Sequence, residues 1–348
     1  MDENAFAQAF QQLLQTQKEK NLERLRQEMA EALAQERREQ AGFEARLYLR
    51  WQRALDLFET ILLLGVRSGG QFNQNLRPYA ANQQDFVFEV LTRIHARSCQ
   101  TMFAILSLLK GGHAMDALAR ARTVHELDVT AHFIATHGNE LAEKYLLYQI
   151  VESLKAARDY EKHYKRLGLE PLSPETIPSL EREVEKYRSK FGEQYTKLLT
   201  KGLYGWAAEA VRKRQPNFED IEEAVDLSHL RPFYKMASYP THASAKGLMF
   251  DIGGIATQKV LPAGPSNAGL ADVGTMALAS FNRCTTLLLC YTHYSSEPAL
   301  LETYANSLLA SQVIHEFVDE ANQAFFEAHQ QLVREELELQ NQEDNIHA

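Results

Sequence analysis

Apolar residues recur at three- and four-residue intervals along most of the chain, which is the spacing of one face of an α-helix. The first such stripe is thin and lies in a segment otherwise rich in Gln, Glu and Ala. It consists of Phe6, Phe10, Leu13, Leu22, Leu25 and Met29. The pattern predicts a solvated amphipathic helix over residues 1–42. Because so thin a stripe cannot form a core alone, we expect it to pack on its own domain, on a second copy or on a partner protein.

Glycines and capping residues divide the next part of the chain. The apolar stripe thickens from Phe43, and Gly69-Gly70 is predicted to end this helix. Asn82 is the expected N-cap of the following helix. Further helices are expected over residues 82–110, 114–137 and 141–167, each followed by glycine.

Three prolines within residues 171–178 introduce a section that is less apolar and more charged. We interpret residues 171–226 as a helical insertion or lobe. Residues 247–269 are rich in Gly and Pro and are predicted to form a loop, after which two long helices are expected over residues 271–294 and 298–339. Strand-like alternation is nearly absent.

The sequence therefore predicts an all-α fold, a multi-helix bundle with a long N-terminal helix and a charged helical insertion. Five segments are expected: the amphipathic helix 1–42, the two halves of the core at 43–170 and 227–334, the insertion 171–226 and an acidic tail 335–348.

Composition narrows the possible functions. The formal net charge of −9 argues against a surface that is basic throughout, so RNA binding would need a local basic patch. Three cysteines are too few for a disulfide framework, and the N-terminus lacks a basic, apolar signal segment, so we expect a cytoplasmic protein. The most apolar stretch contains Asp272, Asn282 and Arg283, which favours a buried core helix and no membrane contact.

Several kinds of chemistry have no motif in this chain. A phosphate-binding G-x-x-x-x-G-K-[ST] loop, a C-x-x-C pair and the Glu-x-x-His motif of bundle di-iron sites are all absent. We therefore expect neither a metal site nor a cofactor.

Two charged residues interrupt the apolar stripe of the segment at 114–137. Arg122 and Glu126 are four residues apart, so a helix would let the guanidinium and the carboxylate meet. One interpretation is a structural ion pair on a half-exposed edge, and the other is a pair that orients a third group or a phosphate in a cleft.

A second polar row is present in FYKMASYPTHASAKG, where Tyr234, Ser238 and His242 are spaced by four residues. Pro240 disfavours one continuous helix, so a kink or a new helix start is expected near His242. The histidine either caps this bend or faces an anion. The same segment contributes Ser244 and Lys246 as candidate binding residues.

These two segments resemble a bacterial family of helical proteins of unknown function, with an A-x-x-R-x-x-x-E motif followed later by Y-x-x-x-S-x-x-x-H-x-S. The matching residues are Ala119, Arg122, Glu126, Tyr234, Ser238, His242 and Ser244. The likeness extends over roughly residues 45–330. That family is distantly similar to the HEPN helical domains, many of which are metal-independent ribonucleases in toxin–antitoxin or phage-defence systems, whereas others only bind.

The resemblance implies a ribonuclease in which Arg122 holds phosphate, His242 moves the proton and Glu126 orients one of them. RNA would then be the partner, and a dimer is expected. The Arg-to-His spacing of HEPN nucleases occurs twice, at Arg120/His125 and Arg158/His163, as often as chance predicts. The alternative is a non-catalytic helical binding or scaffold protein, and a third reading is a sensor that binds an anionic ligand between helices.

Overall fold

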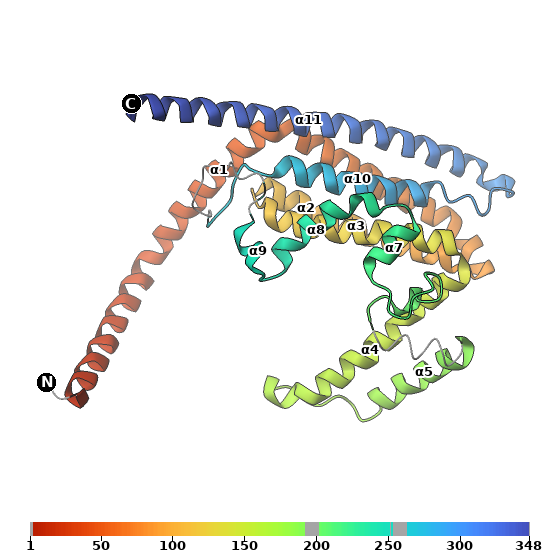
Figure 1. The fold of residues 1–348 in the computed structure, drawn as a ribbon, viewed down its shortest axis with the longest axis horizontal. Helices are drawn as coiled ribbons and strands as arrows, with labels where there is room; N and C mark the ends of the chain where they lie inside the picture. The colour runs from red at the N-terminus through yellow and green to blue at the C-terminus, as the bar shows by residue number, and fades with distance from the viewer. Residues whose placement is uncertain (1–2, 192–201, 251, 253–262, 348) are drawn as a thin grey trace. The chain divides into compact units, whose positions relative to one another are not determined.

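The computed structural model describes residues 3–191, 202–250, 252 and 263–347. Within these ranges the chain forms helices and connecting loops without a β-strand, so the predicted all-α class is confirmed (Figure 1). The chain divides into two units, residues 1–50 and 51–348. The long helix α1 (Glu3–Gln83) begins in the first unit and ends in the second.

The first unit consists of the N-terminal part of α1. Between residues 6 and 33 its large apolar side chains are exposed, whereas Leu47 is buried; the exposed ones are Phe6, Phe10, Leu13, Leu14, Leu22, Leu25, Met29 and Leu33. A helix with an exposed apolar stripe gains little from its own fold. The expectation that a second copy or a partner protein covers this stripe remains a prediction.

The core of the second unit is built by four helices and the part of α1 after residue 50. These helices are α2 (Phe86–Lys110), α3 (Ala114–His137), α10 (Leu270–Leu289) and α11 (Leu301–His347). α3 and α10 pack on α2 and on each other, and α11 packs on α10. The largest fully buried side chains include Trp51, Phe58, Phe133, Phe281 and Phe325. The acidic tail forms the end of α11.

The prediction that Gly69-Gly70 ends a helix is wrong, because α1 continues to Gln83. Gly69 allows α1 to approach α2: a Cβ atom at this position would lie 2.3 Å from Cε1 of His95. The glycine therefore serves close packing rather than helix termination. The N-cap of α2 is Asp85, whose carboxylate accepts a hydrogen bond from the Phe88 amide, and not Asn82.

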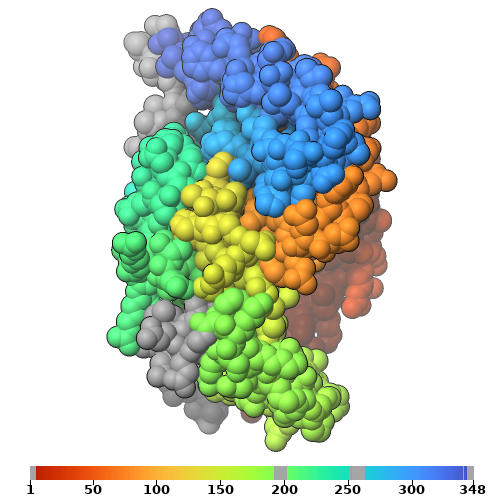
Figure 2. Space-filling model, turned by 90° about the vertical axis from the view of Figure 1, so that its right-hand side faces the viewer, coloured from red at the N-terminus to blue at the C-terminus, as the bar shows by residue number. Residues whose placement is uncertain are grey.

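α4 (Asn139–Leu167) follows α3, and α5 (Thr176–Phe191), the first helix of the charged section 171–226, packs on α4. Short helices come next: η1 (Gly205–Ala207), α7 (Phe218–Ala224), η2 (Ser228–Leu230), α8 (Arg231–Ser238), η3 (Tyr239–Thr241) and α9 (Ala245–Met249). The last short helix is η4 (Pro298–Leu300). α7, α8 and η3 pack on α3, and Figure 2 shows this green segment beside the yellow α3.

Part of the predicted loop 247–269 lies outside the described residues, namely 251 and 253–262. Among the helices that the structure describes, we find none with both the length and the hydropathy required to cross a bilayer.

Candidate functional site

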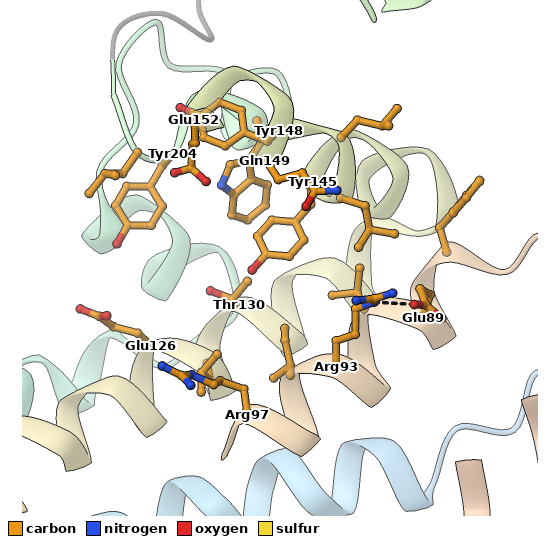
Figure 3. Close-up of a pocket in the computed structure, with 18 of the residues that line it drawn as sticks. Glu89, Arg93, Arg97, Glu126, Thr130, Tyr145, Tyr148, Gln149, Glu152 and Tyr204 are labelled. Carbon is orange, nitrogen blue, oxygen red and sulfur yellow. Dashed lines mark hydrogen bonds and ion pairs between the residues drawn. The ribbon is translucent and has the colours of Figure 1, made fainter. Parts of the chain in front are cut away.

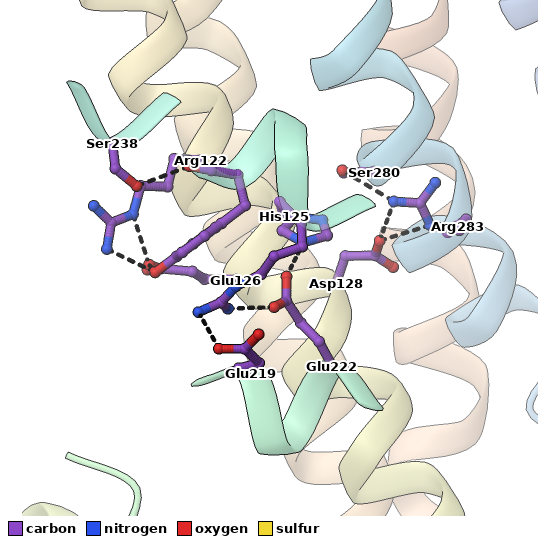
Figure 4. A network of polar contacts seen from close by, with 11 residues as sticks. Arg122, His125, Glu126, Asp128, Glu219, Glu222, Ser238, Ser280 and Arg283 are labelled. Carbon is purple, nitrogen blue, oxygen red and sulfur yellow. Dashed lines mark hydrogen bonds and ion pairs between the residues drawn. The ribbon is translucent and has the colours of Figure 1, made fainter. Parts of the chain in front are cut away.

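Ionisable residues follow one another along α3, although the helix is largely buried. They are Arg122, His125, Glu126, Asp128 and His132. Their partners come from several other elements, so the row joins α3 to the helices around it (Figure 4). A buried charge is costly unless it is paired, and each of these groups has a polar partner.

The Arg122 cluster consists of Arg122, Glu126, Tyr234 and Thr241. Arg122 Nε donates to Glu126 Oε1 over 3.0 Å, which confirms the predicted pair one helical turn apart. Arg122 Nη2 donates to the Tyr234 hydroxyl over 2.7 Å, and that hydroxyl donates to Glu126 Oε1 over 2.9 Å. The three groups form a closed triangle whose members satisfy one another.

The charges in this triangle fix its protonation state. Burial acts to lower the pKa of Arg122, but the carboxylate of Glu126 and the Tyr234 hydroxyl raise it overall. Burial and the charge of Glu126 raise the pKa of Tyr234 to about 12. The phenol therefore stays protonated near neutral pH and acts as a donor to Glu126.

Thr241 belongs to the cluster, although no sequence motif indicated it as a site residue. Its hydroxyl accepts from Arg122 Nη1 over 3.3 Å and donates to the carbonyl of Ser238 over 2.6 Å. A threonine after a proline in a short 3₁₀ turn is typical of loops. Only the packing of η3 on α3 brings it to the guanidinium.

Pro240 breaks the second polar row, as predicted. α8 ends at Ser238, η3 follows, and His242 has an extended backbone with φ of −122° and ψ of 133°. His242 is exposed, and within the described residues its imidazole has neither a hydrogen bond nor an ion pair. It lies next to Thr241 in sequence, at the border of the Arg122 cluster.

The remaining candidate residues serve local structure. The Ser238 hydroxyl donates to the carbonyl of Tyr234 over 2.7 Å. Ser244 is the N-cap of α9, where its hydroxyl accepts from the Gly247 amide over 3.1 Å. Lys246 Nζ lies 4.3 Å from the centre of the Tyr239 ring. Of the seven candidates, Arg122, Glu126 and Tyr234 are joined to one another through their side chains.

Two further clusters on α3 were not expected from the sequence. His125 Nε2 lies 2.9 Å from Glu222 of α7, a fully buried carboxylate that also pairs with Arg231 of α8. Asp128 is fully buried too, and Arg283 Nη2 of α10 lies 2.6 Å from its Oδ2. Their partners lie far apart in sequence, so no local spacing could have indicated them.

The two possible Arg-to-His pairs do not form a site. His125 is buried against Glu222, whereas Arg120 is exposed. Arg158 Nη2 instead pairs with Glu181 of α5 at 2.6 Å, and His163 is exposed.

A cavity of about 750 Å³ lies beside the Arg122 cluster. Glu126 is part of its wall and therefore belongs to both features. In Figure 3, Arg93 and Arg97 of α2 and Glu126 occupy one side, and the opposite side presents polar and aromatic groups from α4 and the following segment. These groups are Tyr145, Tyr148, Gln149, Glu152 and Tyr204.

Burial and nearby carboxylates keep the cavity's phenols protonated. The pKa of Tyr148 is raised to about 12 by burial and by Glu152. The pKa of Tyr204 is raised by burial and by Glu126, and that of Tyr145 by burial and by Glu152. The wall thus offers hydroxyl donors beside aromatic faces.

The fold and the site define an all-helical protein with a polar row on α3 and an adjacent cavity. Residues 88–255 match the model of a family of unknown function (DUF5677). The matched span includes α3, α4, α8 and all but the first two residues of α2, and so both motifs of the sequence analysis. No curated protein and no solved structure gave a match.

Proposed function

We propose that this protein acts by binding, as a non-catalytic helical protein that holds a small molecule in the cavity between α2, α3 and α4. The observation that carries the proposal is the cavity itself, whose volume of about 750 Å³ falls within the range of small-molecule sites. Polar groups converge on it from both sides, as in pockets that orient a ligand.

The Arg122 cluster supports binding more than chemistry. Each of the three guanidinium nitrogens of Arg122 already donates to a protein oxygen. The Tyr234 hydroxyl is engaged on both sides, as acceptor and donor. Such a closed network holds Glu126 in one orientation at the cavity wall, which is what a preorganised binding site requires.

Trp206 provides a direct test because it lines the cavity, and the chain has two tryptophans. In a Trp51→Phe background, Trp206 is the sole indole. We expect the aromatic probe anilinonaphthalene sulfonate to quench its fluorescence in a saturable, one-to-one manner. Thr130 lines the cavity, so the larger side chain in Thr130→Phe should occupy part of its volume and abolish the quenching.

The matched control is Thr136→Phe, an exposed position on the same helix. It should leave probe binding unchanged, and circular dichroism should show both variants to be folded. Quenching that does not saturate, or that is equal in the two variants, would overturn the proposal.

A second candidate is the metal-independent ribonuclease or toxin effector suggested by the HEPN resemblance. The observation in its favour is the bond from Arg122 to Thr241, which places the exposed His242 one residue from the guanidinium's partner. In this scheme His242 would transfer the proton and Arg122 would stabilise the phosphate charge.

RNA cleavage in the presence of EDTA tests this second candidate. Wild type should cleave, whereas His242→Ala and Arg122→Ala should lose activity on the order of a hundredfold or more, as expected for a lost acid–base group. The control is His163→Ala, an exposed histidine elsewhere. Equal RNA integrity with wild type and His242→Ala would exclude this candidate.

A further inference from the structure

We infer that the cavity is built for a ligand that combines an aromatic ring with a phosphate or carboxylate group, and that Arg97 is the anchor for this anion. The inference rests on the proposed binding function and adds the chemical class of the ligand.

The two arginines on the α2 side of the cavity differ in their partners. Arg93 pairs with Glu89, which also pairs with Arg77. Arg97 donates to the neutral Gln100 side chain over 3.2 Å, and no carboxylate pairs with it within the described ranges. Its remaining N–H groups are available, and a guanidinium binds carboxylate and phosphate through paired hydrogen bonds.

Glu126 on the same wall does not cancel this cation. Its carboxylate is held by Arg122 and by the Tyr234 hydroxyl, so its charge is compensated outside the cavity. Arg97 is therefore a cavity-lining cation that pairs with no carboxylate among the described residues, and an anionic group is its natural partner.

The opposite side offers aromatic surface in a fixed orientation. The rings of Tyr145 and Trp206 lie 4.8 Å apart at 73°. Trp206 also packs edge-on against Phe133 of α3, at 5.7 Å and 74°. Aromatic side chains locked in this way favour a flat ring as ligand.

The α4 side also sets the ligand's orientation. Glu152 has no ion-pair partner among the residues that the structure places, and its charge raises the pKa of Tyr145 and Tyr148. An anion would be repelled here, whereas an N–H group of a heteroaromatic ring would be accepted. The ligand's anion should thus face Arg97 and its ring N–H groups should face Glu152.

Isothermal titration calorimetry with two matched pairs of probes tests the inference on the full-length protein. Adenosine monophosphate and adenosine differ in the phosphate, whereas indole-3-acetate and indole-3-acetamide differ in the carboxylate. We expect at least one anion to bind about ten- to a hundredfold more tightly than its neutral analogue, as for one charge-assisted contact. The pair that shows this preference identifies the anion.

Arg97→Gln should remove the preference and leave the affinity of the neutral analogue unchanged. Arg93→Gln, on the same helix face, should retain it, because the Arg93 guanidinium is already engaged by the Glu89 carboxylate. Equal affinities of anion and neutral analogue in wild type, or a preference that persists in Arg97→Gln, would overturn the inference. If the sulfonate probe still binds at Trp206 in that case, the proposed binding function stands; if it does not, both fail.

Discussion

At the scale of single residues, His95 shows how burial decides chemistry. Its imidazole is almost fully enclosed and stacks on Phe281, with ring centres 6.0 Å apart. Burial lowers the pKa of His95 to about 4. It also raises the pKa of the neighbouring Cys99 thiol to about 12. Both groups are therefore neutral at physiological pH, which marks them as core residues rather than a reactive pair.

This histidine predicts a pH dependence of stability. The unfolded imidazole takes up a proton near pH 6.5, whereas the folded one does so near pH 4. The free energy of unfolding is therefore highest above pH 6.5. It falls by about 3 kcal/mol in total as the pH decreases toward 4, because the unfolded state then binds the proton first. Urea unfolding of wild type and His95→Leu at several pH values should show this difference. Parallel pH profiles would contradict it.

The sequence identified part of the site because that part is local. Arg122 and Glu126 follow from the spacing of one helical turn, and Tyr234 followed from the motif resemblance. Arg97 and Glu222 could not be identified, since their roles depend on which helices meet in space. Residue spacing predicts side-chain contacts within one helix but does not predict contacts between helices.

At the scale of helices, glycines set how closely the axes approach. Gly65 of α1 faces Phe281 of α10, and Gly274 of α10 faces Phe325 of α11. In both cases a Cβ atom would lie less than 3.0 Å from the ring. The sequence indicated these helices by periodicity, but it could not distinguish a glycine that ends a helix from one that admits a neighbour.

Two adjacent glycines of α1 should therefore respond oppositely to alanine. Gly69→Ala places a methyl group against His95 and should destabilise the protein by about 1–3 kcal/mol. Gly70 is exposed with nothing nearby, so Gly70→Ala should stabilise the helix by about 0.5–1 kcal/mol. Thermal or urea unfolding measures both, and a shift of the same sign in the two variants would refute this account of α1.

The docking of α7 and α8 on α3 depends on Glu222. Its removal in Glu222→Ala would leave Arg231 and His125 without their buried partner, so we expect a loss of about 3–5 kcal/mol. Glu223→Ala, one position along on the exposed face, should change stability by less than about 0.5 kcal/mol. Similar unfolding midpoints for the two variants would show that the buried carboxylate is not needed.

At the scale of the whole molecule, the exposed stripe in residues 1–50 predicts self-association. Phe10→Glu combined with Met29→Glu places charges in the stripe and should reduce the mass measured by sedimentation to that of a monomer. The control, Gln8→Glu with Gln27→Glu, adds the same charge on other faces of the helix and should leave the sedimentation mass unchanged. A wild type that is already monomeric would argue against self-association.

The charged row on α3 has a consequence for how the chain finds its fold. Tyr234, Glu222 and Arg283 each meet a different residue of α3, and each comes from a different helix. A helix that docked one turn out of place would bury a charge opposite the wrong group, at a cost of several kcal/mol. Purely apolar helix interfaces tolerate a shift of one helix along the other, whereas these charged pairs do not. The charged row therefore specifies the register in which each helix packs on α3, because a shift by one turn would separate the charged partners.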